Sequence, residues 1–305
     1  MAGDLLSGLV HAPVTPFTRA GRIDFDTFSK LIEFHLRNGA DALALPMHAG
    51  ESVSLTEAER RALIEFAIKQ VRGRVPIVVH VSDAGSGIAA AHARHAESAG
   101  AAAIVATTPY YWTPPPAMVL EHFTQIAAAV RIPFLVHNAP EEMAGTRITA
   151  ELALRLMDRA ANFAGVVDSS LDWQFMVELV DLARRPRPAF RLLSGVEYLV
   201  SAGAIGAKGA VSSLAAIAPA AVRRLHDLCA KDQLFEARGV QEEIAAVLQI
   251  LKGSGAAGLK AALRALGRDC GDVRPPLRPL GEVEYGALAE RLSGLALLGA
   301  EPKGW

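Results

Sequence analysis

The chain has 305 residues, 51% of them hydrophobic, and its 31 basic and 32 acidic side chains give a formal net charge of −1. This balance supplies no electrostatic footprint for a nucleic acid or an anionic membrane surface, so it favours a small-molecule ligand. The N-terminus lacks a signal-peptide pattern and no run of about 18 apolar residues occurs, so we expect a cytoplasmic protein. Cys229 and Cys270 lack the spacing of a metal site and are interpreted as free thiols.

Short apolar runs rich in Val, Ile and Leu alternate with longer segments of helical periodicity. This alternation is typical of βα units around a parallel sheet. The apolar runs cover residues 9–14, 42–45, 77–81, 103–106, 134–137, 164–167, 190–193 and 209–212. Eight strand–helix units predict an α/β fold of the (β/α)8 type, a TIM barrel.

Local signals indicate where the helices begin and end. Thr56 with Glu59 forms a capping box, and Gly39, Gly73 and Gly100 lie where a helix should stop before the next strand. From about residue 219 the strand signal vanishes, and Ala-, Leu- and Glu-rich segments continue to the end of the chain. We therefore expect a TIM barrel over residues 1–222 and a C-terminal helical region over residues 223–305.

Short motifs spread over nearly the whole chain resemble those of one enzyme family. They are Val-Thr-Pro-Phe at 14–17, Gly-Glu-Ser at 50–52, Pro-Tyr-Tyr at 109–111, Asn-Ala-Pro at 138–140, Leu-Ser-Gly at 193–195, Gly-Ala-Val-Ser at 209–212 and Arg-Pro-Pro-Leu at 274–277. The family is that of dihydrodipicolinate synthase and N-acetylneuraminate lyase. The resemblance implies a TIM barrel, lyase chemistry on a small oxo- or hydroxy-acid without a cofactor, and a homo-oligomer, either a dimer or a tetramer.

The motif of the sixth strand lacks the residue on which the family's chemistry depends. Residues 163–172 read Phe-Ala-Gly-Val-Val-Asp-Ser-Ser-Leu-Asp, which resembles the family's Gly-(Ile/Val)-Lys-(Asp/Glu)-Ser-Ser/Thr-Gly-Asp. In the family, the lysine of this motif forms a Schiff base with pyruvate, and here Val167 takes its place. An isopropyl group has no amine lone pair, so we expect no pyruvate imine at this position.

Other departures from the family occur at its substrate-holding positions. Met47, His48 and Ala49 stand where members have the paired threonines that hold the substrate carboxylate. His137 replaces the tyrosine that transfers protons beside the Schiff base, and Glu142 replaces an arginine that recognises a second carboxylate in the synthases. Glu142 would repel the carboxylate that an arginine attracts, so the resemblance implies a changed ligand.

Of the family's Tyr-Thr-Tyr proton relay only Tyr111 remains, and the resemblance implies that it reaches across a dimer interface. If the relay geometry is kept, His48, Tyr111 and His137 converge at the carboxyl-end mouth of the barrel and can transfer protons near neutral pH. The alternative is that the two imidazoles merely fill a decayed pocket. We assign His137, His48 and Tyr111 to catalysis, and substrate binding to Ala49, Gly50, Glu142, Val167, Gly195 and Val211.

A metal site and a substitute lysine are two further alternatives. His11 and His80 also lie on predicted strands, as metal ligands would. Strand alternation turns His11 toward the helices if Ala12 keeps the family's inward orientation, and His80 matches an ordinary residue of the lyases, so we expect no metal. Lys208 precedes the last strand, at the end of the barrel opposite the active sites of this fold.

Three hypotheses for the function follow. The first is an enzyme, a lyase, hydratase or isomerase that acts on a small oxo- or hydroxy-acid without a covalent imine and uses His137 and His48 for proton transfer. The second is a pseudoenzyme that binds or senses a small molecule. The third is a metal-dependent aldolase. His48 and His137, which stand at catalytic positions where the family has other residues, favour the first hypothesis. The loss of the carboxylate-binding residues favours a changed substrate.

Overall fold

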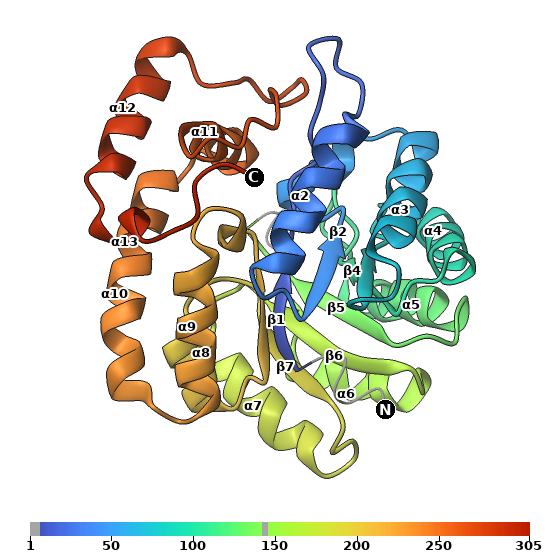
Figure 1. Ribbon diagram of the computed structural model, residues 1–305. Helices are drawn as coiled ribbons and strands as arrows, with labels where there is room; N and C mark the ends of the chain where they lie inside the picture. Colours follow the sequence, from blue (N-terminus) through green and yellow to red (C-terminus); the bar gives the residue numbers. More distant parts are fainter. Residues whose placement is uncertain (1–6, 142–145) are drawn as a thin grey trace. The chain divides into compact units, whose positions relative to one another are not determined.

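The computed structural model describes residues 7–141 and 146–305, and all elements named below belong to that part of the chain. Its eight strands follow one another in chain order around a closed barrel of parallel strands (Figure 1). They are β1 (Gly8–His11), β2 (Ala42–Leu45), β3 (Ile77–His80), β4 (Ala103–Thr107), β5 (Phe134–Asn138), β6 (Phe163–Asp168), β7 (Arg191–Ser194) and β8 (Gly209–Ser212). The chain is a TIM barrel with further helices at its C-terminus, which confirms the predicted fold class.

The first strand differs from its predicted range. It was expected to extend to residue 14, but the strand ends at His11. Pro13 has no backbone N–H to donate to a neighbouring strand, so regular pairing stops before it. The ranges predicted for β2 and β8 are those observed, and the other strands agree within one or two residues.

The chain divides into two compact units, each assembled from segments that are far apart in sequence. The first unit comprises residues 1–8 and 76–211, and the second comprises residues 9–75 and 212–305. The first therefore carries β3 to β7 and most of β8, and the second carries most of β1, all of β2 and the C-terminal helices. The predicted boundary at residue 222 stays a prediction. No helix of residues 7–141 and 146–305 is both long and apolar enough to cross a membrane.

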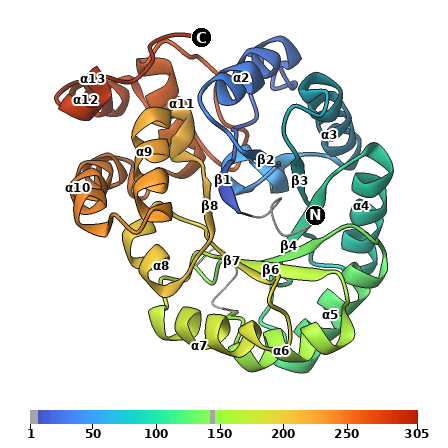
Figure 2. The ribbon, with the colours of Figure 1, turned by 60° about the horizontal axis from the view of Figure 1, so that its bottom comes forward.

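In the first unit a helix follows each strand from β3 to β7. These helices are α4 (Ser86–Ala99), α5 (Pro116–Ala128), α6 (Ala150–Arg159), α7 (Trp173–Arg184) and α8 (Leu199–Ile205). Figure 2 shows α4 to α7 on the outside of the strands of this unit. Across β4 to β7, Thr107, His137, Val167 and Leu193 pair at one level. Because side chains alternate along each strand, residues paired at one level share a face of the sheet.

In the second unit, helices flank β2 and then fill the C-terminal third of the chain. They are α2 (Phe25–Arg37), α3 (Glu57–Val71), α9 (Pro219–Ala230), α10 (Leu234–Leu251), α11 (Gly255–Ala265), α12 (Glu282–Ser293) and α13 (Ala296–Gly299), with short 3-10 turns η1 (His48–Gly50), η2 (Ser52–Ser54) and η3 (Leu214–Ala216). The predicted capping box begins α3, since the Thr56 N–H donates to Glu59 Oε2 at 3.0 Å and the Glu59 N–H donates to Thr56 Oγ1 at 3.3 Å. The helical run expected after residue 219 is confirmed.

His11 points from β1 toward α2, as strand alternation predicted. Its Nδ1 lies 3.0 Å from Nδ1 of His35 on α2, and both imidazoles are fully buried. One of the two nitrogens carries the proton of this hydrogen bond and the other accepts it, which requires that the accepting ring be neutral. Burial lowers the pKa of His11 from 6.5 to about 4 and the pKa of His35 well below 6.5. The pair is therefore a structural contact between two neutral rings.

These buried histidines predict a loss of stability in mild acid. His122 on α5, whose Nδ1 lies 2.9 Å from Ser86 Oγ, also has its pKa lowered by burial to about 4. For His11 and His122, the unfolded chain takes up a proton below about pH 6.5 that the folded chain refuses until about pH 4. The stabilisation is therefore complete above that range and is lost as the pH falls through it. At pH 5 the expected loss is about 2 kcal/mol each for His11 and His122.

Urea unfolding at pH 7.5 and pH 5 measures this loss. The variant His122→Asn should lose about 2 kcal/mol less between the two pH values than the wild type, because one titrating ring is gone. The same pH dependence in both proteins would show that His122 is protonated as easily in the folded as in the unfolded chain.

Candidate active site

His137 and Ser169 form a hydrogen-bonded pair at the carboxyl ends of β5 and β6. His137 Nε2 lies 3.0 Å from Ser169 Oγ, and the Ser169 N–H donates to the carbonyl of Asn138 at 2.8 Å. Ser169 follows Val167 by two residues, so continued alternation keeps it on the face of the sheet that His137 occupies. An imidazole and a hydroxyl at this distance can pass a proton between them.

Gly195, directly after β7, packs against this pair. Its N–H donates to the Asp168 carbonyl at 2.6 Å. A Cβ at this position would collide with Ser169 Oγ and would lie 3.1 Å from the Asp168 carbonyl oxygen. The predicted binding residue Gly195 therefore lies beside the Ser169 hydroxyl, and any side chain there would push that hydroxyl away from His137.

Asp168 and Asn138 form a second polar pair, one residue further along β6 and β5. Asn138 Nδ2 donates to Asp168 Oδ1 at 2.6 Å, and the Ser170 N–H and hydroxyl also donate to this carboxylate. Asn138 Oδ1 in turn accepts from the Ile148 N–H at 3.2 Å. Burial raises the pKa of Asp168, while these donors act in the opposite direction. The pair anchors the segments that follow both strands.

Val167 lies beside His137 on the neighbouring strand and is 1% exposed. It offers an apolar side chain where the family resemblance places an amine. Lys208 is the only lysine between residues 76 and 211, and it is exposed at the amino end of β8. The described part of the first unit thus has no primary amine at the carboxyl ends of its strands.

Tyr111 does not meet His137 within the described part of the first unit. Its side chain is 95% exposed, and its backbone has a φ of 86°, in the left-handed region that a bulky residue rarely adopts. The neighbouring Trp112 is 48% exposed. A tyrosine held in this conformation with its ring in solvent is available to a second copy of the chain, and its catalytic role and the homo-oligomer stay predictions.

In the second unit, the turn η1 carries the predicted site residues His48, Ala49 and Gly50. The His48 side chain is exposed, whereas Ala49 and Gly50 are buried. Thr15 Oγ1 donates to the Gly50 carbonyl at 2.7 Å, and a Cβ at Gly50 would lie 3.2 Å from the carbonyl oxygen of Pro13. The turn is therefore packed closely against the segment after β1, with the His48 imidazole presented outward.

The residues predicted for catalysis and substrate binding do not all lie in one unit. His48 belongs to the second unit and His137 to the first, so their convergence stays a prediction. Val211, on β8, is 8% exposed and buried with the barrel core. Glu142 lies outside the described residues.

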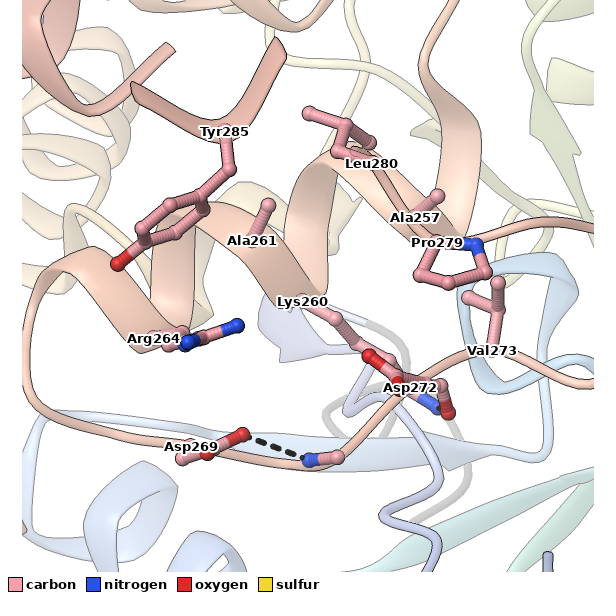
Figure 3. A pocket seen from close by; sticks show the side chains of 11 residues that line it. Ala257, Lys260, Ala261, Arg264, Asp269, Asp272, Val273, Pro279, Leu280 and Tyr285 are labelled. Carbon is pink, nitrogen blue, oxygen red and sulfur yellow. Dashed lines mark hydrogen bonds between the residues drawn. The ribbon is translucent and has the colours of Figure 1, made fainter. Parts of the chain in front are cut away.

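Behind η1, a buried ion pair connects this turn to α11. Lys260 Nζ lies 2.7 Å from Glu51 Oε1 and donates to the Asp272 carbonyl at 2.9 Å, and the Lys260 and Glu51 side chains are 3% and 0% exposed. Glu51 Oε2 accepts the backbone N–H of Arg274 at 2.8 Å. Figure 3 shows Lys260 extending from α11 toward Asp272. Burial lowers the pKa of Lys260, and the adjacent Glu51 carboxylate acts in the opposite direction.

Arg274, the first residue of the late family-like motif, bridges α3, the end of η2 and Gly21. Its guanidinium donates to Glu59 Oε2 at 2.8 Å and Oε1 at 2.6 Å, and to the carbonyls of Ser54 at 3.0 Å and Gly21 at 2.9 Å. These bonds lower the pKa of Glu59 to about 2. Sequence reasoning recognised this motif but missed Lys260, because a lysine on an alanine-rich helix looks like a surface residue until its partner across the fold is known.

The strand histidines do not gather into a metal site. His11 contacts His35, whereas His80 Nε2 lies 2.8 Å from Ser82 Oγ. Among residues 7–141 and 146–305, no group of three or more His, Cys, Asp or Glu side chains is arranged to hold a metal ion.

A closed barrel of eight parallel strands, with polar side chains at the carboxyl ends of β5 and β6, defines the class of TIM-barrel proteins whose sites lie at that end. Within this class, the chain belongs to the dihydrodipicolinate synthetase family, which matches residues 5–295. The family predicted from the motifs is thereby confirmed.

Several members of the family are similar over their whole length. The chain is 30% identical over 286 residues to the 4-hydroxy-tetrahydrodipicolinate synthase of Bacillus subtilis (strain 168), covering 93% of this chain and 97% of that protein. Among solved structures, dihydrodipicolinate synthase from Aquifex aeolicus superimposes with a TM-score of 0.90 at 28% identity, covering 95% of this chain and 98% of that one. A prophage protein of E. coli K12 from the same family, solved in complex with pyruvate, has a TM-score of 0.90 at 27% identity and covers 96% and 99%.

Proposed function

We propose that this member of the family acts on a small oxo- or hydroxy-acid by noncovalent acid–base catalysis, as a lyase, hydratase or isomerase. One observation carries the proposal: at a single level of the sheet, β6 presents the buried Val167 and β5 presents His137, which is bonded to Ser169. The position that the resemblance assigns to the imine-forming lysine has no amine. The position that it assigns to the proton-transferring tyrosine has an imidazole.

His137 can serve this chemistry because histidine is the side chain whose ordinary pKa lies nearest to neutral pH. As a base, Nε2 would accept a proton from a substrate hydroxyl or from a carbon next to a carbonyl, and the negative charge left on the substrate would need donors nearby. The Ser169 hydroxyl, 3.0 Å from Nε2, is placed to donate such a hydrogen bond or to relay the proton. Gly195 leaves the space that this hydroxyl occupies.

The substrate class follows from the family and is modified by the altered residues. A relative from E. coli K12 was solved in complex with pyruvate, which supports a small 2-oxo acid or a related hydroxy-acid. The hydroxyls and the arginine expected for carboxylate binding are replaced here by Met47, His48, Ala49 and Glu142. We infer that the acid differs from those of the synthases and that His48 assists in proton transfer.

Borohydride trapping with pyruvate, read by intact mass, tests the absence of the imine. We expect no adduct on this protein under conditions that label a lysine-bearing member of the family. An adduct mapped to Lys260 or Lys208 would show that another amine has replaced the missing one, and the noncovalent mechanism would be abandoned.

The role of His137 is tested by following a panel of 2-oxo and 2-hydroxy acids in D2O by NMR, for conversion or for exchange of carbon-bound protons. For any acid of the panel that responds, His137→Ala should lower the rate of conversion or of proton exchange about 10²–10⁴-fold, the usual contribution of a positioned acid–base group. Ser169→Ala should lower it less, and His95→Asn, on α4, should leave it unchanged. Turnover at the wild-type rate in His137→Ala would contradict the proposal.

The alternative functions predict other outcomes in the same experiments. Tight binding of an acid with neither conversion nor proton exchange would favour the binding or sensing protein. Stoichiometric metal in protein purified without a His-tag, together with activity that a chelator removes, would favour the metal-dependent aldolase.

A further inference from the structure

The first unit contains a hollow of about 280 Å³ at the amino ends of β7 and β8. Four cationic side chains line it: Arg184 ends α7, Arg187 follows in the next loop, Arg191 begins β7, and Lys208 immediately precedes β8. No aspartate or glutamate is among its lining residues. His137 lies at the carboxyl end of its strand, so the hollow is at the opposite end of the sheet of this unit.

The four charges have no counter-charge of their own. Arg187 donates to the carbonyls of Phe163 at 2.7 Å and Met157 at 2.9 Å, and Arg191 donates to the carbonyl of Pro188 at 3.0 Å. Carbonyl oxygens fix a guanidinium in place without neutralising it. Within residues 7–141 and 146–305, no ion pair joins any of the four to a carboxylate.

Arg184 and Lys208 are the two members of this cluster with side chains available to a ligand. Both are exposed, and neither side chain makes a hydrogen bond or ion pair within the described part of the chain. In contrast, Arg187 and Arg191 are half-buried and are held by the backbone. Two guanidinium groups held by the backbone and two exposed cations therefore surround one concave space.

Four like charges around a hollow repel one another, and the chain as a whole has a net charge of only −1, so this concentration of charge is local. An anion in the hollow would remove the repulsion. Arginine and lysine are the side chains that bind phosphate oxygens best, arginine through paired N–H donors and lysine as a compact charge. A single carboxylate would leave most of the charge uncompensated, so the site favours an anion with more than one negative charge.

The floor of the hollow is apolar. Its lining includes Val180, Ala183, Phe190, Leu192 and Ile205. An inorganic anion would leave this surface without a partner, whereas an organic phosphate could place its apolar part against it. Small-molecule pockets usually measure roughly 300–1,000 Å³ and combine an apolar lining with a few polar groups. A hollow of about 280 Å³ is close to the lower end of that range.

We propose that this hollow is a binding site for a small organic phosphate that carries at least two negative charges and an aromatic or apolar part, as a nucleoside diphosphate does. Arg187 and Arg191 form the fixed part of the phosphate site. Arg184 and Lys208 close on the phosphates from the exposed side. The apolar floor receives the rest of the ligand.

The test is calorimetric titration of the full-length protein with ADP and, separately, with inorganic pyrophosphate. We expect ADP to bind more tightly than pyrophosphate, and we expect binding to weaken when salt is raised, because the attraction is partly screened. The double variant Arg184→Gln, Lys208→Gln should weaken ADP binding by about tenfold or more, since each lost charge-assisted hydrogen bond is worth about that factor. Both side chains are exposed and unpartnered, so this variant should fold as the wild type does.

Arg94→Gln is the matched control, because Arg94 is an exposed arginine of α4 in the same unit. It should bind ADP as the wild type does, and so should His137→Ala, which separates this site from the proposed active site. ADP affinity unchanged in the double variant would overturn the proposal, as would the lack of heat from either ligand at millimolar concentration. Binding of duplex DNA but of neither small phosphate would also overturn it and would assign the cluster to a nucleic acid.

Discussion

Val167→Lys is expected to form a borohydride-trappable adduct with pyruvate, whereas the wild-type protein forms none. The variant should gain the mass of one reduced pyruvyl group, mapped to residue 167. One side chain would then supply the amine that position 167 lacks in the wild-type protein. The expectation follows from the position of Val167 on β6, beside His137 on β5, in a chain that belongs to the dihydrodipicolinate synthetase family.

The environment of residue 167 favours the reactive form of a lysine. Val167 is 1% exposed and lies between His137 and Leu193 on the neighbouring strands. Burial disfavours the charged ammonium and so lowers the pKa of a lysine introduced there, which raises the fraction of neutral amine at pH 7. His137 could then exchange protons with the carbinolamine and the imine. Because the residues expected to hold the carboxylate are replaced, we expect the adduct to need a high pyruvate concentration.

Val167→Met serves as the control, because methionine is similar in length to lysine but has no amine. This variant should give no adduct. Urea unfolding of both variants establishes that they are folded during trapping. A folded Val167→Lys protein that stays unlabelled, while a lysine-bearing relative is labelled in parallel, would show that residue 167 does not occupy the imine position.

Lys260→Met is expected to cost about 3–5 kcal/mol of stability, because it leaves a buried carboxylate without its charge partner. The Glu51 side chain is 0% exposed and would retain the hydrogen bond from the Arg274 N–H. Since Glu51 immediately follows η1, the loss should also displace the turn that carries His48. The free energy of unfolding from urea titration measures the loss of stability. The rate at which the responsive acid is converted measures the displacement of the turn.

A control variant separates the effect of breaking the Lys260–Glu51 ion pair from the effect of removing a lysine elsewhere. Lys252→Met, an exposed site directly after α10, should change stability by less than about 0.5 kcal/mol. The double variant Glu51→Gln, Lys260→Met should be less destabilised than the sum of the two single variants, because it leaves no isolated buried charge. Additive effects of the two substitutions would show that the charges do not interact in the folded protein.

The strands and the first turns of the helices were predictable because their signals are local. Apolar runs flanked by helical periodicity located all eight strands, and the Thr56–Glu59 capping box located the start of α3. Strand alternation also predicted that His11 points toward the helices, and its contact with His35 on α2 agrees with that orientation. The early end of β1 was the exception. The strand ends at His11, ahead of Pro13, because a proline lacks the N–H that regular pairing needs, and a run of apolar residues does not reveal this limit.

The candidate site was predictable in part. The motifs drew attention to Val167 and His137, whose roles stay predictions, but Ser169 was not singled out, because its contact with His137 depends on the register between β5 and β6. The exposure of Tyr111 was also not evident, because nothing in Pro-Tyr-Tyr shows that its backbone turns into the left-handed region. Contacts between residues about 30 positions apart are decided by strand pairing and not by local sequence.

What the residues themselves determined is that the sixth-strand motif carries a valine at position 167, a side chain that has no amine whatever the fold does around it. Periodicity and motif spacing likewise determined the barrel, since both arise from neighbours along the chain. The tertiary structure decided which side chains act together. It bonded His137 to Ser169, buried Lys260 against Glu51, and gathered Arg184, Arg187, Arg191 and Lys208 around one hollow. Burial and pairing depend on packing between distant segments, and that packing exists only once the chain has folded.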